Sequence, residues 1–395
     1  MPLAEASRHS TESPIQAMSG QIVVGITHPQ TCLTLTGRLR ALREAGYWVT
    51  LVCSPGELLD RTAAIEGVDA VAIPMRRGIA PLADLVSFLR LWRLLRRLRP
   101  RLTEFSTPKA GLLGTVAARL AGVPQRVYML RGLKLETSTG FKQFVLLAAE
   151  RLTAACADVV LCNSVSLRAE ALARGVAPAN KLHLLGDGSS NGIDVERFSP
   201  GLSNVRERLG IASDVPVVGF VGRLTCDKGV PELVKAFDVI LRVLPNAQLL
   251  LVGWFDAADD ALSEELRARI EGHKQIHLTG FVKDTAPYYR AMDVMVLPTW
   301  REGFPNVVLE AAATGIPVVT TFSTGSRDSV VPEVTGLLIP PGYPGAISEA
   351  VLRLLRNADR RRRMGIAAQA WVIERFSDER VLRLTNEYYK RLLES

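Results

Sequence analysis

The sequence predicts an α/β protein of two doubly wound parallel sheets that face each other across a cleft, and three observations lead to this fold class. Short apolar, β-branched runs alternate with amphipathic helical patterns along almost the whole chain, as in parallel sheets that are buried on both faces. The alternation forms two series, one from about residue 20 to 185 and one that restarts near residue 215. The length of 395 residues also exceeds what a single hydrophobic core usually serves.

The first series begins with QIVVGI, which predicts a strand, followed by the amphipathic LTGRLRALREAG and a second strand, WVTLVC. Further along, FLRLWRLLRRLRPRL (residues 88–102) predicts a helix that ends at Pro100, because proline cannot continue it. DVVLCNS predicts a later strand of the same series.

The basic helix has an apolar side and a basic side. Helical spacing puts three arginines together: Arg90, Arg93 and Arg97. The apolar side is expected to comprise Leu85, Phe88, Leu89, Trp92 and Leu95. Two interpretations stay open: a surface helix packed on a sheet, or a face that meets phospholipid or a lipid-linked acceptor. No nucleic-acid partner is expected, because no recognition module accompanies the arginines.

Between the two series lies GDGSSNGIDVERFSPG, whose Gly, Ser and Asp content predicts a hinge. The second series contains the strands predicted from VPVVGFVG, AQLLLVGW, IHLTGF, DVMVLPT and IPVVTTF. We therefore expect two Rossmann-like domains, residues 20–198 and 199–375, and a C-terminal helix over residues 376–395 that crosses back to the first domain. Residues 1–19 lack the apolar core and cleavage site of a secretory signal and are expected to be disordered.

Composition limits the class of protein further. No stretch reaches the roughly 18 uninterrupted apolar residues of a membrane-spanning helix. The five cysteines are odd in number and lack zinc spacing, which indicates a cytosolic protein with reduced thiols. The formal net charge of +8 indicates an anionic partner, such as a membrane surface or a phosphorylated small molecule.

The stretch REGFPNVVLEAAATG (residues 301–315) carries the first candidate site. It should form a strand-to-helix loop, REGFPN, and a helix whose N-terminus carries a partial positive charge that suits a diphosphate. Gly303 lets the backbone approach a ligand closely. Glu302 and Glu310 then accept hydrogen bonds from hydroxyls on either side of the phosphate, which is the order of groups in a nucleotide sugar. The alternative is an amphipathic helix with two surface acids.

A second candidate segment, GFVGRLTCDKGVPELVKAF, places Arg223 and Lys228 between another predicted strand and helix. Two cations there can neutralise a departing diphosphate without a metal. The sequence has no Asp-x-Asp pair for a metal-chelated diphosphate, so no metal cofactor is expected. The alternative is surface placement of both cations.

Together these motifs resemble the family-4 glycosyltransferases, retaining enzymes with the two-domain GT-B fold. Glu302 and Glu310 match the family's E-x7-E motif. The family's G-R-x(4)-K-G element matches at Gly222, Arg223, Lys228 and Gly229. LTGFV, NGID and TGLLIPP also look like family features, so the resemblance covers nearly the whole chain.

The resemblance implies a role for each matching residue. Arg223 and Lys228 would hold the diphosphate, with Glu302 as the third residue of the catalytic set, and Glu310 would bind the ribose. The nucleotide-sugar site would also include the following residues: Gly222, Phe304, Asn306 and Val307 near the phosphate and the donor sugar, and Phe281 and Val282 near the base.

The N-terminal half resembles the branch that assembles lipid-linked or surface polysaccharides, on the residues HPQTCLTLTGRLRALREAGYWVTLVCSPG and STPKAGLLGTVAARLAGVPQRVYMLRGL. This implies an acceptor-binding role for the first domain. The chain departs from the family at His28-Pro29, where paired glycines are common, and at Arg131-Gly132, where many members carry a histidine. Arg131 is a poor base because it stays protonated. Candidate contacts to the nucleotide sugar or the acceptor are His28, Arg131 and Asn191.

The expected function is retaining transfer of a sugar from a nucleotide sugar, UDP-linked by family frequency, to a saccharide or lipid-linked acceptor in polysaccharide or glycoconjugate biosynthesis. The alternatives are a nucleotide-sugar 2-epimerase of the same fold, against which the E-x7-E motif argues, and a non-catalytic sugar-nucleotide-binding protein. The expected location is the cytoplasm, and peripheral attachment to the inner face of the cell membrane stays open with the second interpretation of the basic helix.

Overall fold

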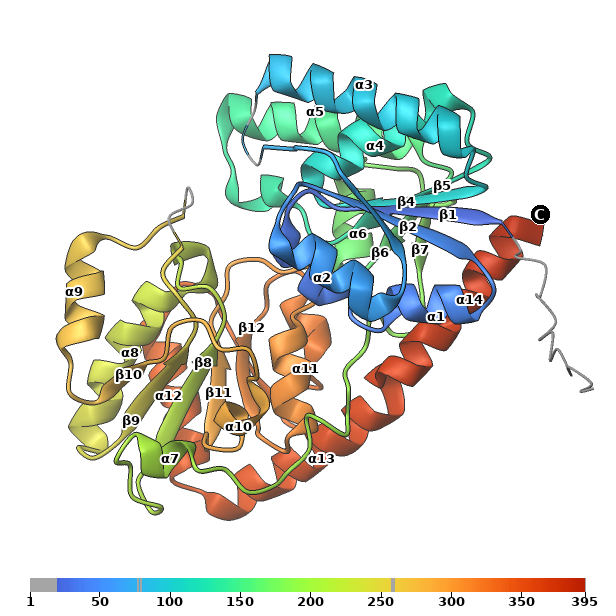
Figure 1. Ribbon diagram of the computed structural model, residues 1–395. Coiled ribbons are helices and arrows are strands. Elements are labelled where there is room, and N and C mark those ends of the chain that lie inside the picture. The colour runs from blue at the N-terminus through green and yellow to red at the C-terminus, as the bar shows by residue number, and fades with distance from the viewer. Residues whose placement is uncertain (1–19, 77, 79, 257–259, 395) are drawn as a thin grey trace, which may run out of the picture.

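The computed structural model describes residues 20–76, 78, 80–256 and 260–394. These residues form two parallel β-sheets, each covered by helices (Figure 1). The α/β class and the two doubly wound sheets predicted from the sequence are confirmed. The tail over residues 1–19, which we predicted to be disordered, lies outside the described residues.

Among the described residues, the first sheet has seven strands in the order β3-β2-β1-β4-β5-β6-β7, and all neighbouring pairs are parallel. Its strands are β1 (Gln21–Gly25), β2 (Trp48–Cys53), β3 (Asp69–Ala72), β4 (Leu102–Ser106), β5 (Gln125–Leu130), β6 (Val159–Cys162) and β7 (Leu182–Leu184). The order reverses between β1 and β4, so the loops after these two strands diverge and leave a crevice at the carboxyl edge of the sheet.

The helices of the first sheet alternate with its strands along the chain. They are η1 (Pro29–Leu35), α1 (Arg38–Glu44), α2 (Glu57–Glu66), α3 (Pro81–Leu98), α4 (Pro108–Ala121), η2 (Lys134–Thr137), α5 (Gly140–Cys156) and α6 (Val165–Ala173). Helices α3, α4 and α5 lie together over one face of the sheet (Figure 1). Their N-termini point toward the carboxyl edge, as helices between parallel strands must.

The second sheet, in the described part of the chain, has six parallel strands in the order β10-β9-β8-β11-β12-β13. Its strands are β8 (Val217–Val221), β9 (Gln248–Val252), β10 (Ile276–Leu278), β11 (Val294–Leu297), β12 (Val318–Thr321) and β13 (Gly336–Ile339). The order reverses between β8 and β11. The sequence placed Arg223 and Lys228 after the first of these strands and Glu302 after the second, so both candidate segments follow strands at one crevice.

The helices of the second half, apart from the last, belong to this second sheet. They are α7 (Val205–Arg208), η3 (Cys226–Lys228), α8 (Val230–Val243), α9 (Glu264–Gly272), α10 (Ala286–Tyr289), α11 (Asn306–Ala313), η4 (Ser326–Ser329), α12 (Pro344–Leu355) and α13 (Ala358–Phe376). The strands are buried, as the continuous apolar runs predicted.

The last helix, α14 (Asp378–Glu394), follows α13 and reaches the first sheet (Figure 1). Its Tyr389 is fully buried there, and the tyrosine hydroxyl contacts both Glu104 on β4 and Arg38 on α1. At the junction of the two helices, Ile193 of the connecting segment pairs with Ser377. The chain therefore passes between the two sheets twice at neighbouring places.

The sequence missed some elements, and one residue of the predicted apolar side of α3 was wrong, while Phe88, Leu89, Trp92 and Leu95 are buried or half-buried as predicted. The short or partly polar strands β3, β4, β5, β7 and β13 were not predicted individually. On α3 the buried side chains are Ser87, Leu91, Leu94 and Leu95, whereas Leu85 is 55% exposed. The prediction for Leu85 was wrong because α3 packs mainly on α4, which the helical pattern alone does not reveal.

The described residues contain no helix that is long and apolar enough to cross a membrane.

Candidate active site

The loops after β8 and β11 meet at the crevice of the second sheet. The loop after β8 leads through Gly222 and Arg223 into η3, where Lys228 lies. The backbone N–H of Trp300, in the loop after β11, donates to the carbonyl oxygen of Asp227 at 2.9 Å. These two loops, some seventy residues apart in sequence, therefore form one surface.

Lys228 and Glu302, both predicted as site residues, form an ion pair across these loops. Their side chains are 17% and 16% exposed, so the pair lies at the surface of the crevice and is partly shielded from water. Burial acts to raise the pKa of the adjacent Asp227, but the positive charge of Lys228, a hydrogen bond from Thr225 and the charges of two nearby arginines together outweigh it, and the pKa of Asp227 lies below its usual value. Lys228 is therefore a cation surrounded by carboxylates.

Arg223 has a carboxylate partner that the sequence did not reveal. Its guanidinium lies 2.8 Å from Asp256, which follows β9. The arginine side chain is 35% exposed at the crevice. The structure thus places both predicted cations at one sheet edge, each held in position by an acid.

Helix α11 begins at Asn306, as predicted from REGFPNVVLE, with Pro305 before it. Phe304 is buried against Phe376, with ring centres 5.2 Å apart, and this packing fixes the loop. The backbone N–H groups of the first turn, at Asn306 and Val307, point along the helix axis toward the crevice, where they suit an anion.

Glu310 lies on α11 and is largely buried. Its carboxylate accepts a hydrogen bond of 2.7 Å from the hydroxyl of Tyr289 on α10, and burial raises the pKa of Glu310. Tyr289 was missed by sequence reasoning, because nothing in the local pattern connects α10 with α11. A carboxylate held by one hydroxyl is suited to accept others, such as those of a ribose.

An aromatic pair, one ring exposed and the other half-buried, lies beyond Arg223 on the β9 side of the crevice. Phe281, predicted near the base, is 60% exposed, and its ring stands edge-to-face to Trp254 at 5.5 Å. The neighbouring Val282 packs partly on the core. Trp254 was missed, although its position directly after the apolar run AQLLLVG is a readable signal. Exposed rings at a strand end offer a surface on which a nucleobase can stack.

The first domain contributes Arg131 and Asn191 to the opposite wall. Arg131 donates to Ser190 at 2.9 Å, and burial together with the charge of Arg38 lowers the pKa of its guanidinium to about 10. Asn191 is buried, and its Oδ1 has no hydrogen-bond partner among the described residues. Arg131 therefore remains charged at neutral pH and lies beside a chain segment with free hydrogen-bonding capacity.

At Gly303 the backbones of the two domains approach closely. A Cβ atom at this position would lie 2.0 Å from the carbonyl oxygen of Arg131, which no side chain could tolerate. The sequence predicted that Gly303 admits a ligand, whereas in the structure it admits the backbone of the first domain. Arg131 and Glu302 are thus brought together across the domain boundary.

His28 has a structural role in the loop after β1. Its Nδ1 accepts a hydrogen bond of 3.3 Å from the N–H of Gln30 and caps η1. This capping accounts for a histidine before proline at the start of a helical turn. The contact of His28 with a substrate stays a prediction.

Comparison with known proteins gives matches along both halves of the chain. A family model described as "Glycosyl transferase 4-like domain" matches residues 35–188, and one described as "Glycosyl transferases group 1" matches residues 215–357. The chain is 34% identical over 369 residues to the capsular polysaccharide biosynthesis glycosyltransferase CapM of Staphylococcus aureus, covering 93% of this chain and 96% of the relative.

Two further matches extend this similarity. Over 346 residues the chain is 28% identical to a UDP-Gal:alpha-D-GlcNAc-diphosphoundecaprenol alpha-1,3-galactosyltransferase of Escherichia coli, covering 84% of this chain and 88% of the relative. The solved structure of Anabaena Alr3699/HepE in complex with UDP-glucose has the same fold, with a TM-score of 0.78 at 19% identity, over 94% of this chain and 100% of that one.

Proposed function

Since the chain belongs to the family-4 glycosyltransferases and has the GT-B fold, we propose that it transfers a sugar, with retention of configuration, from a UDP-linked nucleotide sugar to a saccharide or lipid-linked acceptor. The reaction belongs to polysaccharide or glycoconjugate biosynthesis. The observation that carries this proposal is the meeting of Lys228 and Glu302 at the crevice between β8 and β11, at the N-terminus of α11.

The side chains around this crevice provide a partner for each part of a nucleotide sugar. The base stacks near Phe281 and Trp254, and the ribose hydroxyls meet Glu310. The diphosphate lies between Arg223, Lys228 and the N–H groups of α11, where Gly222 leaves room. UDP as the nucleotide is supported by the E. coli relative, named for UDP-Gal, and by the structural neighbour that holds UDP-glucose.

Catalysis in this site rests on positioning and charge stabilisation. The acceptor hydroxyl oxygen bonds to the anomeric carbon on the face from which the diphosphate leaves, and the bond between that carbon and the phosphate oxygen breaks. A leaving phosphate oxygen takes the hydroxyl proton, so no protein nucleophile is required. Lys228 and Arg223 neutralise the charge that develops on the diphosphate, and Glu302 orients Lys228 and a sugar hydroxyl. No metal cofactor takes part.

A peripheral location on the inner face of the cell membrane, with the protein in the cytoplasm, is part of the proposal. Arg90, Arg93 and Arg97 are all exposed on α3. The same helix exposes Leu82 at 83%, and α5 exposes Phe141 at 81%. Cations and exposed apolar side chains in one layer of helices, here that of α3, α4 and α5, are a combination that binds an anionic lipid surface.

Two alternatives have less support. A nucleotide-sugar 2-epimerase shares the fold but does not account for the paired Glu302 and Glu310. A non-catalytic binding protein does not account for the ion pair of Lys228, which keeps the predicted leaving-group cation in place.

The proposal is tested by incubating the purified protein with a panel of UDP-, GDP- and ADP-sugars and following the released sugar by NMR. Slow hydrolysis of one of them to the α-anomer from an α-linked substrate supports a retaining transferase. Release of the β-anomer contradicts retention. Formation of a free sugar epimerised at C2 identifies the epimerase, and absence of turnover with the whole panel contradicts the proposal.

A further inference from the structure

A second cavity lies beside the crevice, at the carboxyl ends of β12 and β13. It has a volume of about 270 Å³ and lies between the two domains. From the first domain it is lined by Glu136 of η2 and by Glu170 and Arg174 of α6, and from the second by loop residues after β11, β12 and β13. None of these side chains belongs to the nucleotide-sugar site described above.

An indole ring forms part of the wall of this cavity. Trp300 follows β11 and is 42% exposed. Its ring packs on Gly342, which has a φ of +80° and where a Cβ atom would lie 2.5 Å from the indole. The ring is therefore held in place by a glycine that no other residue replaces without strain. Phe322, 52% exposed, adds a second aromatic side chain.

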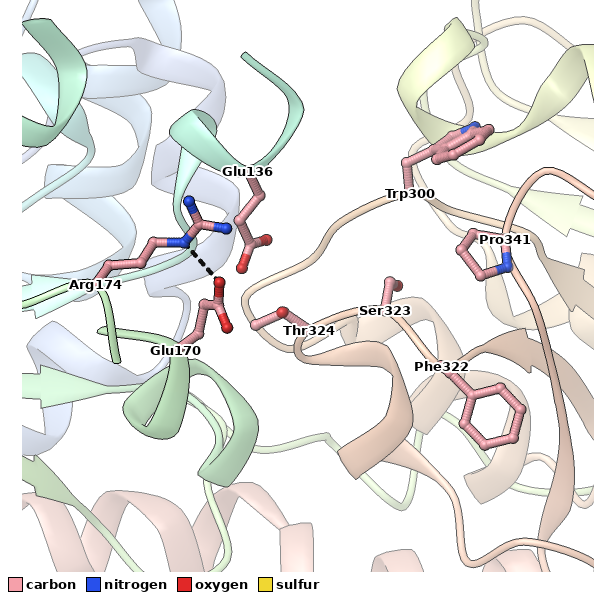
Figure 2. A pocket seen from close by; sticks show the side chains of 8 residues that line it. All are labelled: Glu136, Glu170, Arg174, Trp300, Phe322, Ser323, Thr324 and Pro341. Carbon is pink, nitrogen blue, oxygen red and sulfur yellow. Dashed lines mark hydrogen bonds and ion pairs between the residues drawn. The ribbon is translucent and has the colours of Figure 1, made fainter. Parts of the chain in front are cut away.

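A carboxylate faces the cavity from the other domain. Glu136 Oε1 is buried and has no hydrogen-bond partner in the described part of the chain. Burial raises the pKa of Glu136, although the hydroxyl of Thr324 acts in the opposite direction. Figure 2 shows the Glu136 carboxylate directed toward Thr324 and the space between the domains. A buried carboxylate oxygen without a partner is costly unless a ligand supplies a donor.

The remaining polar groups are already paired or are hydroxyls. Glu170 accepts from Arg174 at 2.5 Å (Figure 2). Ser323 and Thr324 present hydroxyl-bearing side chains from the opposite wall. With two carboxylates and one guanidinium, the cavity has a formal charge of −1. It disfavours a phosphate and suits a neutral or amino-bearing molecule rich in hydroxyls.

The cavity is coupled to the predicted reaction centre through the backbone. The N–H of Glu302 donates to the carbonyl oxygen of Thr324 at 3.1 Å. Trp300 lies only two positions before Glu302. The site residues and the cavity follow the order of the strands along the sheet edge. The aromatic pair lies at β9–β10, the cations follow β8, Glu302 follows β11, and this cavity lies at β12–β13.

We propose that this cavity binds one sugar ring of the acceptor saccharide, stacked on Trp300 and hydrogen-bonded to Glu136. This inference rests on the proposed function, because it names the substrate class of the same enzyme. Aromatic rings contact the C–H faces of sugars, and carboxylates accept from their hydroxyls. The volume lies below the roughly 300–1,000 Å³ of pockets for drug-sized ligands and suits a single ring.

The five tryptophans of the chain allow both sites to be observed in one experiment. The protein is labelled with 5-fluorotryptophan, and the ¹⁹F lines of Trp300 and Trp254 are assigned with Trp300→Phe and Trp254→Phe. UDP is titrated to report on the nucleotide site through Trp254. Methyl glycosides of glucose, galactose, mannose, N-acetylglucosamine and glucosamine are then titrated, with inorganic phosphate as the alternative ligand.

A saturable shift of the Trp300 line by at least one glycoside is the expected result. The apparent Kd for that glycoside should rise by about tenfold or more in Glu136→Gln, because a hydrogen bond to a charged group is lost. Glu271→Gln, an exposed carboxylate on α9, is the matched control and should leave the titration unchanged.

Three outcomes overturn the proposal: no shift with any glycoside at tens of millimolar, an equal Kd in wild type and Glu136→Gln, or a stronger response to phosphate than to glycosides. If Trp254 responds to UDP while Trp300 stays silent to glycosides, the cavity proposal fails and the proposed function stands. If neither line responds, the proposed function fails as well.

Discussion

Lys228 and Glu302 form an ion pair at the crevice, and this pairing keeps the ammonium group at the position proposed for the diphosphate. Glu302 neutralises Lys228 and fixes the position of its ammonium group. A diphosphate brings more negative charge than one carboxylate, so it can compete for the same ammonium. As the diphosphate leaves, its charge increases and the contact strengthens, which is the condition for lowering the barrier.

For the individual residues of the candidate site, the sequence predicted which ones gather at the crevice but not the side chains that they contact. The positions of Lys228, Glu302 and Glu310 were predictable because the first two lie between a strand and a helix and the third lies on the helix that follows. Asp256 and Tyr289 could not be predicted, because each meets its partner only through the order of strands and helices in the fold, and for Trp254 the sequence signals a strand end but not the contact with Phe281.

Lys228→Ala should lower kcat/KM for hydrolysis of the nucleotide sugar by a factor of roughly 30 to 1,000, equal to about 2–4 kcal/mol, since a contact made in the transition state is lost. The fold should stay intact, as checked by circular dichroism. Lys235→Ala, an exposed lysine on α8, is the control and should keep wild-type kinetics. Wild-type kcat/KM in Lys228→Ala would show that this residue does not serve the leaving group.

Helices α3 and α14 show that a helical pattern predicts which residues share a side of a helix but not which neighbour the helix packs on. The exposed positions of Arg90, Arg93 and Arg97 followed from their spacing. The error at Leu85 arose because a helix packs on whichever neighbour the topology provides, here α4. The return of α14 to the first sheet depends on contacts of Tyr389 with Glu104 and Arg38, which lie 285 and 351 residues earlier in the chain, and no local pattern reveals such contacts.

The arginine face of α3 can be tested by the triple change of Arg90, Arg93 and Arg97 to glutamine. Each arginine near an anionic surface contributes about 1 kcal/mol to the binding free energy. The triple variant should therefore stay in the supernatant when anionic liposomes are sedimented, whereas the wild type should sediment with them. High salt should have the same effect on the wild type, because it screens the attraction.

A charge-matched control removes three arginines elsewhere, at Arg356, Arg362 and Arg363 near α13, all of them exposed. This control should still sediment with the liposomes. If wild type and α3 variant stay equally in the supernatant at low salt, the membrane interpretation is wrong and α3 is a surface helix that packs on α4.

The buried cluster under α14 should be sensitive to the loss of one charge. Arg38 and Glu104 are 1% and 0% exposed, and the charge of Glu104 helps to raise the pKa of Arg38 against the effect of burial. Glu104→Gln leaves Arg38 buried without its counter-ion and should lower the free energy of unfolding by about 3 kcal/mol.

The measurement is chemical denaturation of Glu104→Gln beside Glu387→Gln, an exposed carboxylate on α14 that should change stability little. Equal stability of both variants would show that the ion pair does not hold α14 on the first sheet.

For the whole molecule, the sequence was sufficient to predict the class of fold and to predict which residues gather at the crevice of the second sheet. Two series of buried strands predicted two sheets, and the carboxyl edge of the second was expected to carry the nucleotide sugar. The sequence was not sufficient for the contacts between the domains. Two such contacts arise only when two independently packed sheets are brought together: the approach of Gly303 to Arg131, and the placement of Glu136 and Trp300 in the wall of one cavity.

We propose that Arg223, Lys228 and the N-terminus of α11 hold the diphosphate without a metal ion. This is tested by the initial rate of nucleotide-sugar hydrolysis by metal-stripped protein in excess EDTA, beside the same reaction with magnesium or manganese. Equal rates are expected, because side-chain cations and helix N–H groups supply the charge stabilisation. Complete loss of activity in EDTA that magnesium or manganese restores would contradict it.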